Sequence, residues 1–203
     1  MIVTNSILLF TCAISIYAMY NADVMNRLIY NTEAFFKGDY YRALTSAFVH
    51  AGWGHLLLNM ISFWSFSGPI ERAFQMRFPM GSTCYLLFYI AAIIVSELPS
   101  ILKQRDNRNY RTLGASGAIS AVIFSCMVLS PTTQMIVMFI PMPAFVFGPV
   151  YLLYTAWASQ KQPNSGINHD AHMYGALFGI AATVLLFPGS FTLFFQQVGA
   201  WLW

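Results

Sequence analysis

The chain has 203 residues, of which 58% are hydrophobic and 8% are charged, and its formal net charge is +3 at pH 7. Soluble domains carry roughly 25% charged residues, so this composition excludes an ordinary water-soluble domain and predicts a single transmembrane domain over residues 1–203. The basic residues are scattered among acidic ones, which argues against a nucleic-acid partner.

Six apolar segments are predicted to be membrane-spanning helices, because a helix of about 20 residues crosses the hydrocarbon core. Open sheets would leave backbone groups unpaired in lipid, so we expect an all-α membrane protein, a bundle of six transmembrane helices. Glu71, Arg72 and Arg77 are expected to close the second segment, and Pro141 and Pro143 should delay the fifth helix until about Ala144. The aromatic tail, residues 191–203, is a candidate interfacial segment. The six segments are residues 2–20, 52–70, 81–98, 115–130, 135–159 and 171–187.

The second segment begins with polar residues that an ordinary membrane-spanning helix would avoid. His55 and Asn59 are four residues apart and share one helix face, and His50 lies just before the expected helix start. Polar and ionisable side chains inside a span are costly and usually mark function, although a single one can be explained by hydrogen bonding between helices. The three together favour a functional site.

The fourth segment opens with the small-residue turn Gly114-Ala115-Ser116-Gly117, which places a serine at a helix start. Free backbone N–H groups gather at such a start, and they suit a nucleophile whose reaction produces an oxyanion. A serine in this position can also be a plain N-cap. The tetrapeptide alone leaves both interpretations open.

The sixth segment carries His172 on the same face as Gly175 and Gly179, a Gly-x-x-x-Gly spacing that lets another helix approach closely. If this face packs on the small residues of the fourth segment, His172 and Ser116 meet. A serine and a histidine in contact can perform acyl transfer, because the histidine takes the hydroxyl proton and later protonates the leaving amine. The matching row in the fourth segment is Gly117, Ala121 and Ser125.

These motifs, in this order, resemble the rhomboid intramembrane serine proteases. The resemblance covers residues 40–187 and rests on His-x-x-x-x-His-x-x-x-Asn at 50–59, Gly-x-Ser-Gly at 114–117 and Ala-His-x-x-Gly-x-x-x-Gly at 171–179. Each motif is weak alone, whereas three in order on six apolar segments are specific. The resemblance implies a six-helix fold and cleavage of single-span membrane proteins within the bilayer, without a metal, nucleotide or other cofactor.

The resemblance also implies roles for the site residues. Ser116 would be the nucleophile and His172 the general base, while His55, Asn59 and the backbone N–H of Ser116 would bind the oxyanion. His50 would support the first loop. The supporting small residues would be Gly114, Gly117, Gly175 and Gly179.

Two positions depart from, or could extend, the family pattern. Many members have Tyr or Phe four residues after the nucleophile, stacked on the base, and this chain has Ser120 there. Tyr174 is a candidate substitute. Asp170 lies two residues before His172, but residues two apart on a helix do not face each other, so we expect Asp170 to be a helix cap and not a member of a triad.

The expected location is an integral, multi-pass position in a bacterial inner membrane. The loops after the first, third and fifth segments are rich in basic residues, and the positive-inside rule would place them in the cytoplasm. The resemblance implies the opposite orientation, with the active site opening on the outer side. The basic residues of these loops are Arg27, Lys37, Arg42, Lys103, Arg105, Arg108, Arg111 and Lys161.

Other functions are open alternatives. A catalytically silent relative could bind or escort membrane proteins. A metal-dependent membrane hydrolase could use His50, His55, His169, Asp170 and His172, although two histidines at i and i+5 do not match the usual i, i+4 metalloprotease pattern. A channel or transporter would need polar residues lining a path. The expected partners are transmembrane substrates and the lipid bilayer, and the oligomeric state is left open.

Overall fold

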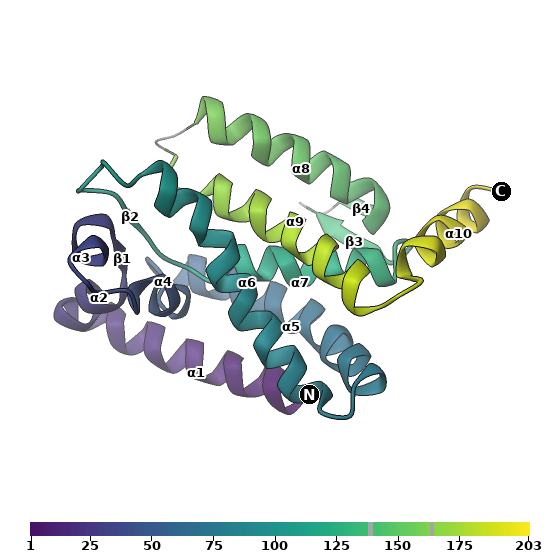
Figure 1. The fold of residues 1–203 in the computed structure, drawn as a ribbon, viewed down its shortest axis with the longest axis horizontal. Helices are drawn as coiled ribbons and strands as arrows, with labels where there is room; N and C mark the ends of the chain where they lie inside the picture. Colours follow the sequence, from purple (N-terminus) through teal and green to yellow (C-terminus); the bar gives the residue numbers. More distant parts are fainter. Residues whose placement is uncertain (138–139, 163–164) are drawn as a thin grey trace.

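The computed structural model describes residues 1–137, 140–162 and 165–203, which are mostly helical (Figure 1). The long helices are α1 (Ile2–Met19), α5 (Trp53–Arg77), α6 (Gly81–Lys103), α7 (Ser116–Leu129), α8 (Ala144–Lys161), α9 (His169–Leu186) and α10 (Ser190–Leu202). Short elements fill the connections: α2 (Ala22–Leu28), β1 (Tyr30–Asn31), α3 (Thr32–Phe36), α4 (Arg42–Thr45), the 3₁₀ helix η1 (Ser46–Phe48), β2 (Arg111–Thr112), β3 (Gln134–Val137) and β4 (Ile140–Pro143).

Each of the six apolar segments contains one long helix. Within the described residues, α1 and α6 are long and apolar enough to cross a membrane, and α9 with α10 forms a third candidate that is bent by 107°. At 14 residues, α7 is shorter than a full span. Each predicted segment therefore contains a long helix, α10 is a further one, and six membrane crossings stay a prediction.

Two small antiparallel ladders interrupt the helical pattern, so the expectation of a purely α structure was incomplete. In the first part of the fifth segment β3 pairs antiparallel with β4, so that Gln134 lies opposite Pro143. Helix is disfavoured there because Pro141 and Pro143 lack a backbone N–H, and α8 begins at Ala144 as predicted. The second ladder pairs β1 with β2.

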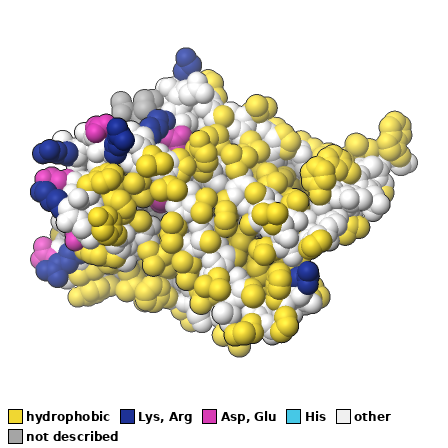
Figure 2. Space-filling model, in the orientation of Figure 1, with side chains coloured by type: hydrophobic (Ala, Val, Ile, Leu, Met, Phe, Trp, Pro, Cys, Tyr) yellow, Lys and Arg dark blue, Asp and Glu magenta, His cyan; other side chains and the backbone are white. Residues whose placement is uncertain are grey.

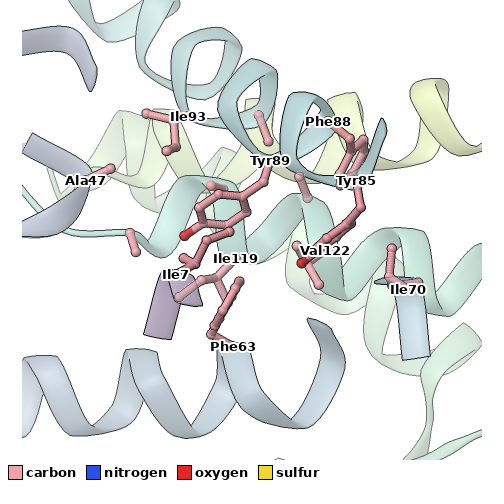
Figure 3. Close-up of a cluster of buried hydrophobic side chains, with 14 of the residues drawn as sticks. Ile7, Ala47, Phe63, Ile70, Tyr85, Phe88, Tyr89, Ile93, Ile119 and Val122 are labelled. Carbon is pink, nitrogen blue, oxygen red and sulfur yellow. The ribbon is translucent and has the colours of Figure 1, made fainter. Parts of the chain in front are cut away.

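The core lies around α7, which α5, α6 and α9 surround (Figure 1). Phe63 of α5, Tyr89 of α6 and Val122 of α7 have almost no exposed surface and point toward one another, with Ile119 beside them (Figure 3). The helix that begins with Ser116 is thus the most enclosed of the bundle, which holds its first residue in a fixed place.

The outside of the bundle is largely apolar. Leu9, Leu58, Leu153 and Leu185 are large exposed side chains on four different helices. Charged side chains instead gather over the end of the molecule that carries α2, α3 and β2 (Figure 2). An apolar face of this extent with charges at one end is the surface expected of a protein in a lipid bilayer.

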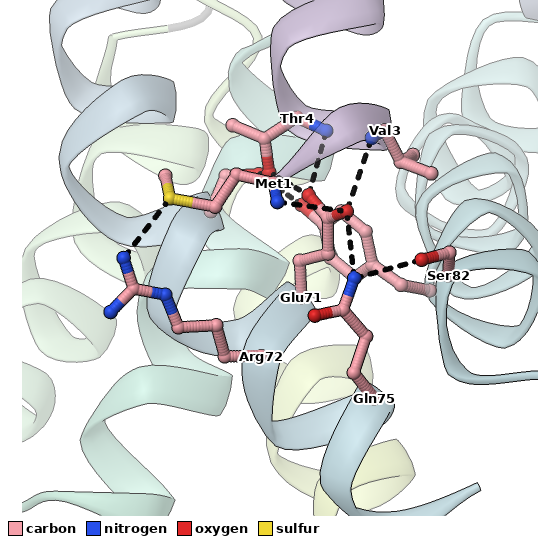
Figure 4. A network of polar contacts seen from close by, with 9 residues as sticks. Met1, Val3, Thr4, Glu71, Arg72, Gln75 and Ser82 are labelled. Carbon is pink, nitrogen blue, oxygen red and sulfur yellow. Dashed lines mark hydrogen bonds and ion pairs between the residues drawn. The ribbon is translucent and has the colours of Figure 1, made fainter. Parts of the chain in front are cut away.

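Glu71 is fully buried inside α5 and does not end the segment, which corrects the expectation from the sequence; α5 continues to Arg77. Its carboxylate accepts hydrogen bonds from the backbone N–H groups of Val3 (3.1 Å) and Thr4 (2.9 Å) and from the Thr4 hydroxyl (2.7 Å) (Figure 4). The first N–H groups of a helix have no partner within the helix. Glu71 supplies it and so joins α5 to the start of α1.

Candidate active site

Ser116 and His172 meet where two helices begin. Ser116 is the first residue of α7, His172 lies in the first turn of α9, and His172 Nε2 is 2.7 Å from Ser116 Oγ. Both residues are half-buried. Ala115 occupies the N-cap position of α7, so the interpretation of Ser116 as only a helix cap is wrong. The contact that the small-residue rows predicted is present.

Glycines make this approach possible. A Cβ atom on Gly175 would overlap the carbonyl of Gly117, and one on Gly179 would overlap the carbonyl of Ala121. The Ser125 hydroxyl donates to the Ala121 carbonyl (2.9 Å) and also lies 3.3 Å from the Gly179 carbonyl. The backbones of α7 and α9 are therefore in direct contact along two turns, which sets the two helix starts side by side.

The loop before Ser116 rests on His55. Gly114 has φ +110°, a conformation that residues with a side chain rarely adopt, and its N–H donates to the Ser46 carbonyl (2.9 Å). A Cβ atom on Gly114 would lie 2.8 Å from His55 Cε1 and 2.9 Å from His55 Nε2. The structure thus brings His55 to the turn that carries Ser116.

The other two residues of the second-segment motif, His50 and Asn59, both contact His55. His50 is fully buried, its Nδ1 is 2.8 Å from the hydroxyl of Ser15 in α1, and its ring meets the His55 ring edge to face at 4.9 Å. Asn59 is buried one turn after His55, and its Nδ2 donates to the His55 carbonyl (2.9 Å). One N–H of the Asn59 amide is therefore already bonded within α5. The binding of an oxyanion by His55 and Asn59 stays a prediction.

A tyrosine that the sequence did not indicate lies on the imidazole. The Tyr151 ring of α8 is stacked on the His172 ring, with centroids 6.4 Å apart and planes at 16°. Its hydroxyl is 2.8 Å from Ser120 Oγ. Tyr174, the substitute considered from the sequence, is exposed. The only signal was the Phe147–Tyr151 spacing of four on α8, which does not reveal what the ring faces.

Asp170 is not the cap of α9, contrary to expectation. It bonds Lys103 Nζ (2.8 Å) and the Ser159 hydroxyl. Asn168 is the cap, because its side-chain oxygen accepts the Ala171 N–H (3.0 Å). Asp170 thus connects α9 to α6 and α8, away from His172.

Asn168 also contacts a buried carboxylate that sequence reasoning missed. Its Nδ2 lies 3.3 Å from both carboxylate oxygens of Glu97 in α6, and its Oδ1 accepts from the Ser100 hydroxyl at 2.8 Å. Glu97 is buried. Together these contacts attach the start of α9, four residues before His172, to α6.

The histidines do not form a metal-binding set in the part of the chain that the structure describes. There, no group of three or more His, Cys, Asp or Glu side chains could hold a metal ion. His50, His55, His169, Asp170 and His172 instead contact serines, aromatic rings and a lysine. The metal-dependent alternative gains no support from this arrangement.

Comparison with known proteins identifies the family. The family model described as "Rhomboid domain" matches residues 37–189. The chain is 30% identical to "RHOMBOID-like protein 12, mitochondrial" of Arabidopsis thaliana, over 83% of this chain and 53% of that protein. It is 31% identical to "Presenilin-associated rhomboid-like protein, mitochondrial" of Homo sapiens, over 68% of this chain and 35% of that protein. It is 27% identical to "Rhomboid protease GluP" of Bacillus subtilis (strain 168), over 76% of this chain and 28% of that protein.

These relatives bear on length, location and family. The chain spans about half or less of the length of the relatives it matches. Several of them are mitochondrial, so the expectation of a bacterial inner membrane is not supported. The family model covers most of the chain, and its range includes Ser116 and His172, whose contact brings the matched motifs together. The protein is therefore a membrane-embedded member of the rhomboid family.

Proposed function

We propose that the protein is an intramembrane serine endopeptidase that cleaves single-span membrane proteins with Ser116 and His172. The observation that carries the proposal is the 2.7 Å contact between Ser116 Oγ and His172 Nε2 at the starts of two apolar helices. A nucleophile and a base within hydrogen-bond reach are the minimum for this chemistry.

The proposed reaction has two steps. Ser116 Oγ attacks the carbonyl carbon of the scissile bond while His172 Nε2 takes its proton, and His172 then gives that proton to the leaving amine, which leaves an acyl-enzyme. Water, deprotonated by His172, attacks the ester, and the proton returns to Ser116 Oγ as the acid is released. The N–H of Ser116, with His55 and Asn59, would stabilise the oxyanion, and one such donor contributes about 3–4 kcal/mol.

We propose further that the six long helices α1, α5, α6, α7, α8 and α9 all cross the membrane as one domain, residues 1–203. The apolar outer surface supports this arrangement. The 107° bend before α10 supports an interfacial position for that helix. The site would open on the side of the 103–111 loop, because α5, α7 and α9 all begin there. Reporter fusions at Asn107 and at Gln75 would show which of these two ends faces the cytoplasm.

One experiment tests the catalytic proposal. The full chain is purified, reconstituted in liposomes with a model single-span substrate, and compared with Ser116→Ala and His172→Ala. We expect cleavage by the wild type alone, and fluorophosphonate labelling that is lost in Ser116→Ala. Folded wild type that neither cleaves the substrate nor takes up the label would favour the alternative, a silent rhomboid-like protein that binds or escorts membrane partners.

A further inference from the structure

Tyr151 connects the two helices that carry the serine and the histidine. Its ring lies nearly parallel to the His172 ring, and its hydroxyl is within hydrogen-bond distance of Ser120 Oγ. Ser120 in turn donates to the backbone carbonyl of Ser116 (2.9 Å). One side chain of α8 therefore contacts the imidazole on α9 and, through Ser120, the first turn of α7.

The surroundings fix the position of the Tyr151 ring. Phe124 of α7 lies 5.5 Å away and Phe147 of α8 lies 5.3 Å away, measured between ring centroids. Aromatic rings at such separations attract each other, and the hydroxyl contact to Ser120 restricts rotation of the Tyr151 side chain. The ring beside the imidazole is thus held in place by Phe124 and Phe147 and by the hydrogen bond to Ser120.

The histidine needs such a surface. A general base works only when the nitrogen that takes the proton points at the nucleophile, and the acidic residue nearest in sequence, Asp170, bonds Lys103 and Ser159 instead. Rotation of the His172 side chain would take Nε2 out of reach of Ser116 Oγ. The Tyr151 ring lies nearly parallel to the imidazole, with centroids 6.4 Å apart, and opposes that rotation.

We propose that Tyr151 is a positioning residue, which holds the His172 imidazole in line with Ser116 by ring stacking and is itself held by Ser120. This inference rests on the proposed protease function. It assigns to α8 a task that, in the family pattern, belongs to the residue four positions after the nucleophile. The small side chain at Ser120 leaves room for the tyrosine and supplies its hydrogen-bond partner.

The test uses the full chain in liposomes with the model single-span substrate. Tyr151→Leu removes the ring, Tyr151→Phe keeps the ring and removes the hydroxyl, and Ser120→Ala removes the partner of that hydroxyl. Phe145→Leu is the matched control, because it removes an aromatic ring from α8 that packs on Trp201 of α10. For each variant, kcat, KM, the rate of fluorophosphonate labelling and the thermal unfolding midpoint are measured.

We expect Tyr151→Leu to lower kcat and the labelling rate by about tenfold, part of the roughly 10²–10⁴-fold that a positioned base supplies, with KM nearly unchanged. Tyr151→Phe and Ser120→Ala should each lower kcat by only about threefold. Their double variant should be no slower than Ser120→Ala alone, because Tyr151→Phe removes only a hydrogen bond that Ser120→Ala already removes. Phe145→Leu should keep the wild-type kcat.

Two results would overturn the inference while leaving the protease function intact. One is that Tyr151→Leu cleaves as fast as the wild type. The other is that Phe145→Leu loses as much kcat as Tyr151→Leu, which would mean that α8 packing alone matters. A folded wild-type chain that neither cleaves nor reacts with the probe would instead overturn the proposed function, and this inference with it.

Discussion

Gly175 of α9 lies directly against the backbone carbonyl of Gly117 in α7, with no space for a side chain between them. At this point the backbones of the two helices that carry His172 and Ser116 are in direct contact. The spacing of the two helix starts depends on it.

Gly175→Ala should therefore push α9 away from α7. We expect cleavage to fall by at least about 100-fold, since a misplacement of about 1 Å can cost that much, together with a lower unfolding midpoint. Gly199→Ala in α10 is the control, because a Cβ atom there meets no other atom within 4 Å. Equal activity in the two variants would show that the close packing does not set the Ser116–His172 contact.

Gly114→Ala tests whether His55 must remain against the turn before Ser116. The new Cβ would lie within 3 Å of the His55 ring, and the residue would keep a positive φ. Gly166→Ala, also at a positive φ but with open space around it, isolates the backbone strain of about 1–2 kcal/mol. We expect both variants to lose stability and only Gly114→Ala to lose kcat strongly, as measured by cleavage of the model substrate. A similar kcat for both variants would show that the position of His55 against this turn does not matter for cleavage.

Glu71→Ala should destabilise the protein without altering the reactive residues. It leaves the N–H groups of Val3 and Thr4 without their acceptor, and each buried donor left unpaired costs about 1–3 kcal/mol. We expect the free energy of unfolding in detergent to fall by roughly 3 kcal/mol, whereas the adjacent, exposed Arg72→Ala should change it little. An unchanged unfolding midpoint in Glu71→Ala would contradict the idea that this carboxylate anchors α1.

The Asn168–Glu97 contact can be tested by exchanging its partners. Asn168→Asp keeps an oxygen for the Ala171 N–H but places two carboxylates together, and Glu97→Gln alone removes the charge that accepts from Asn168. Both single variants should lower the unfolding midpoint and the cleavage rate. The double variant should recover most of both, because it restores one amide opposite one carboxylate.

The two quantities are measured on all four proteins in the same liposomes. The free energy of coupling follows from the double-mutant cycle. Additive losses, with no recovery in the double variant, would mean that the pair does not position the start of α9.

The sequence allowed the Ser116–His172 contact to be predicted because it depends on rows of small residues with helical spacing, and spacing along one helix is visible in a sequence. The start of α8 at Ala144 was predictable for a similar reason, since proline lacks the N–H that a helix needs. Both depend on local chemistry.

The contacts that escaped prediction join residues distant along the chain. Tyr151 and His172 lie on different helices, and nothing local in α8 reveals which of its faces meets α9. Glu71 was interpreted as the polar end of an apolar segment, and Glu97 was overlooked, because the sequence gives no sign of the donors that will surround a carboxylate. Asn168 was overlooked for a different reason: its bond to the Ala171 N–H is local, but the neighbouring acidic Asp170 is an equally plausible cap in the sequence.

The region between α1 and α5 is bonded to the segment that leads to Ser116. Tyr30 pairs with Thr112, and the Gly114 N–H donates to the Ser46 carbonyl. The length and sequence of this region are therefore constrained by its contacts with the segment before Ser116, and not only by the need to connect α1 to α5. Insertions near residues 30–31 or 46 should be poorly tolerated, whereas the exposed turn at Gly38 could accept them. Changes in this connection are therefore expected to alter the proposed cleavage activity even when Ser116 and His172 are unchanged.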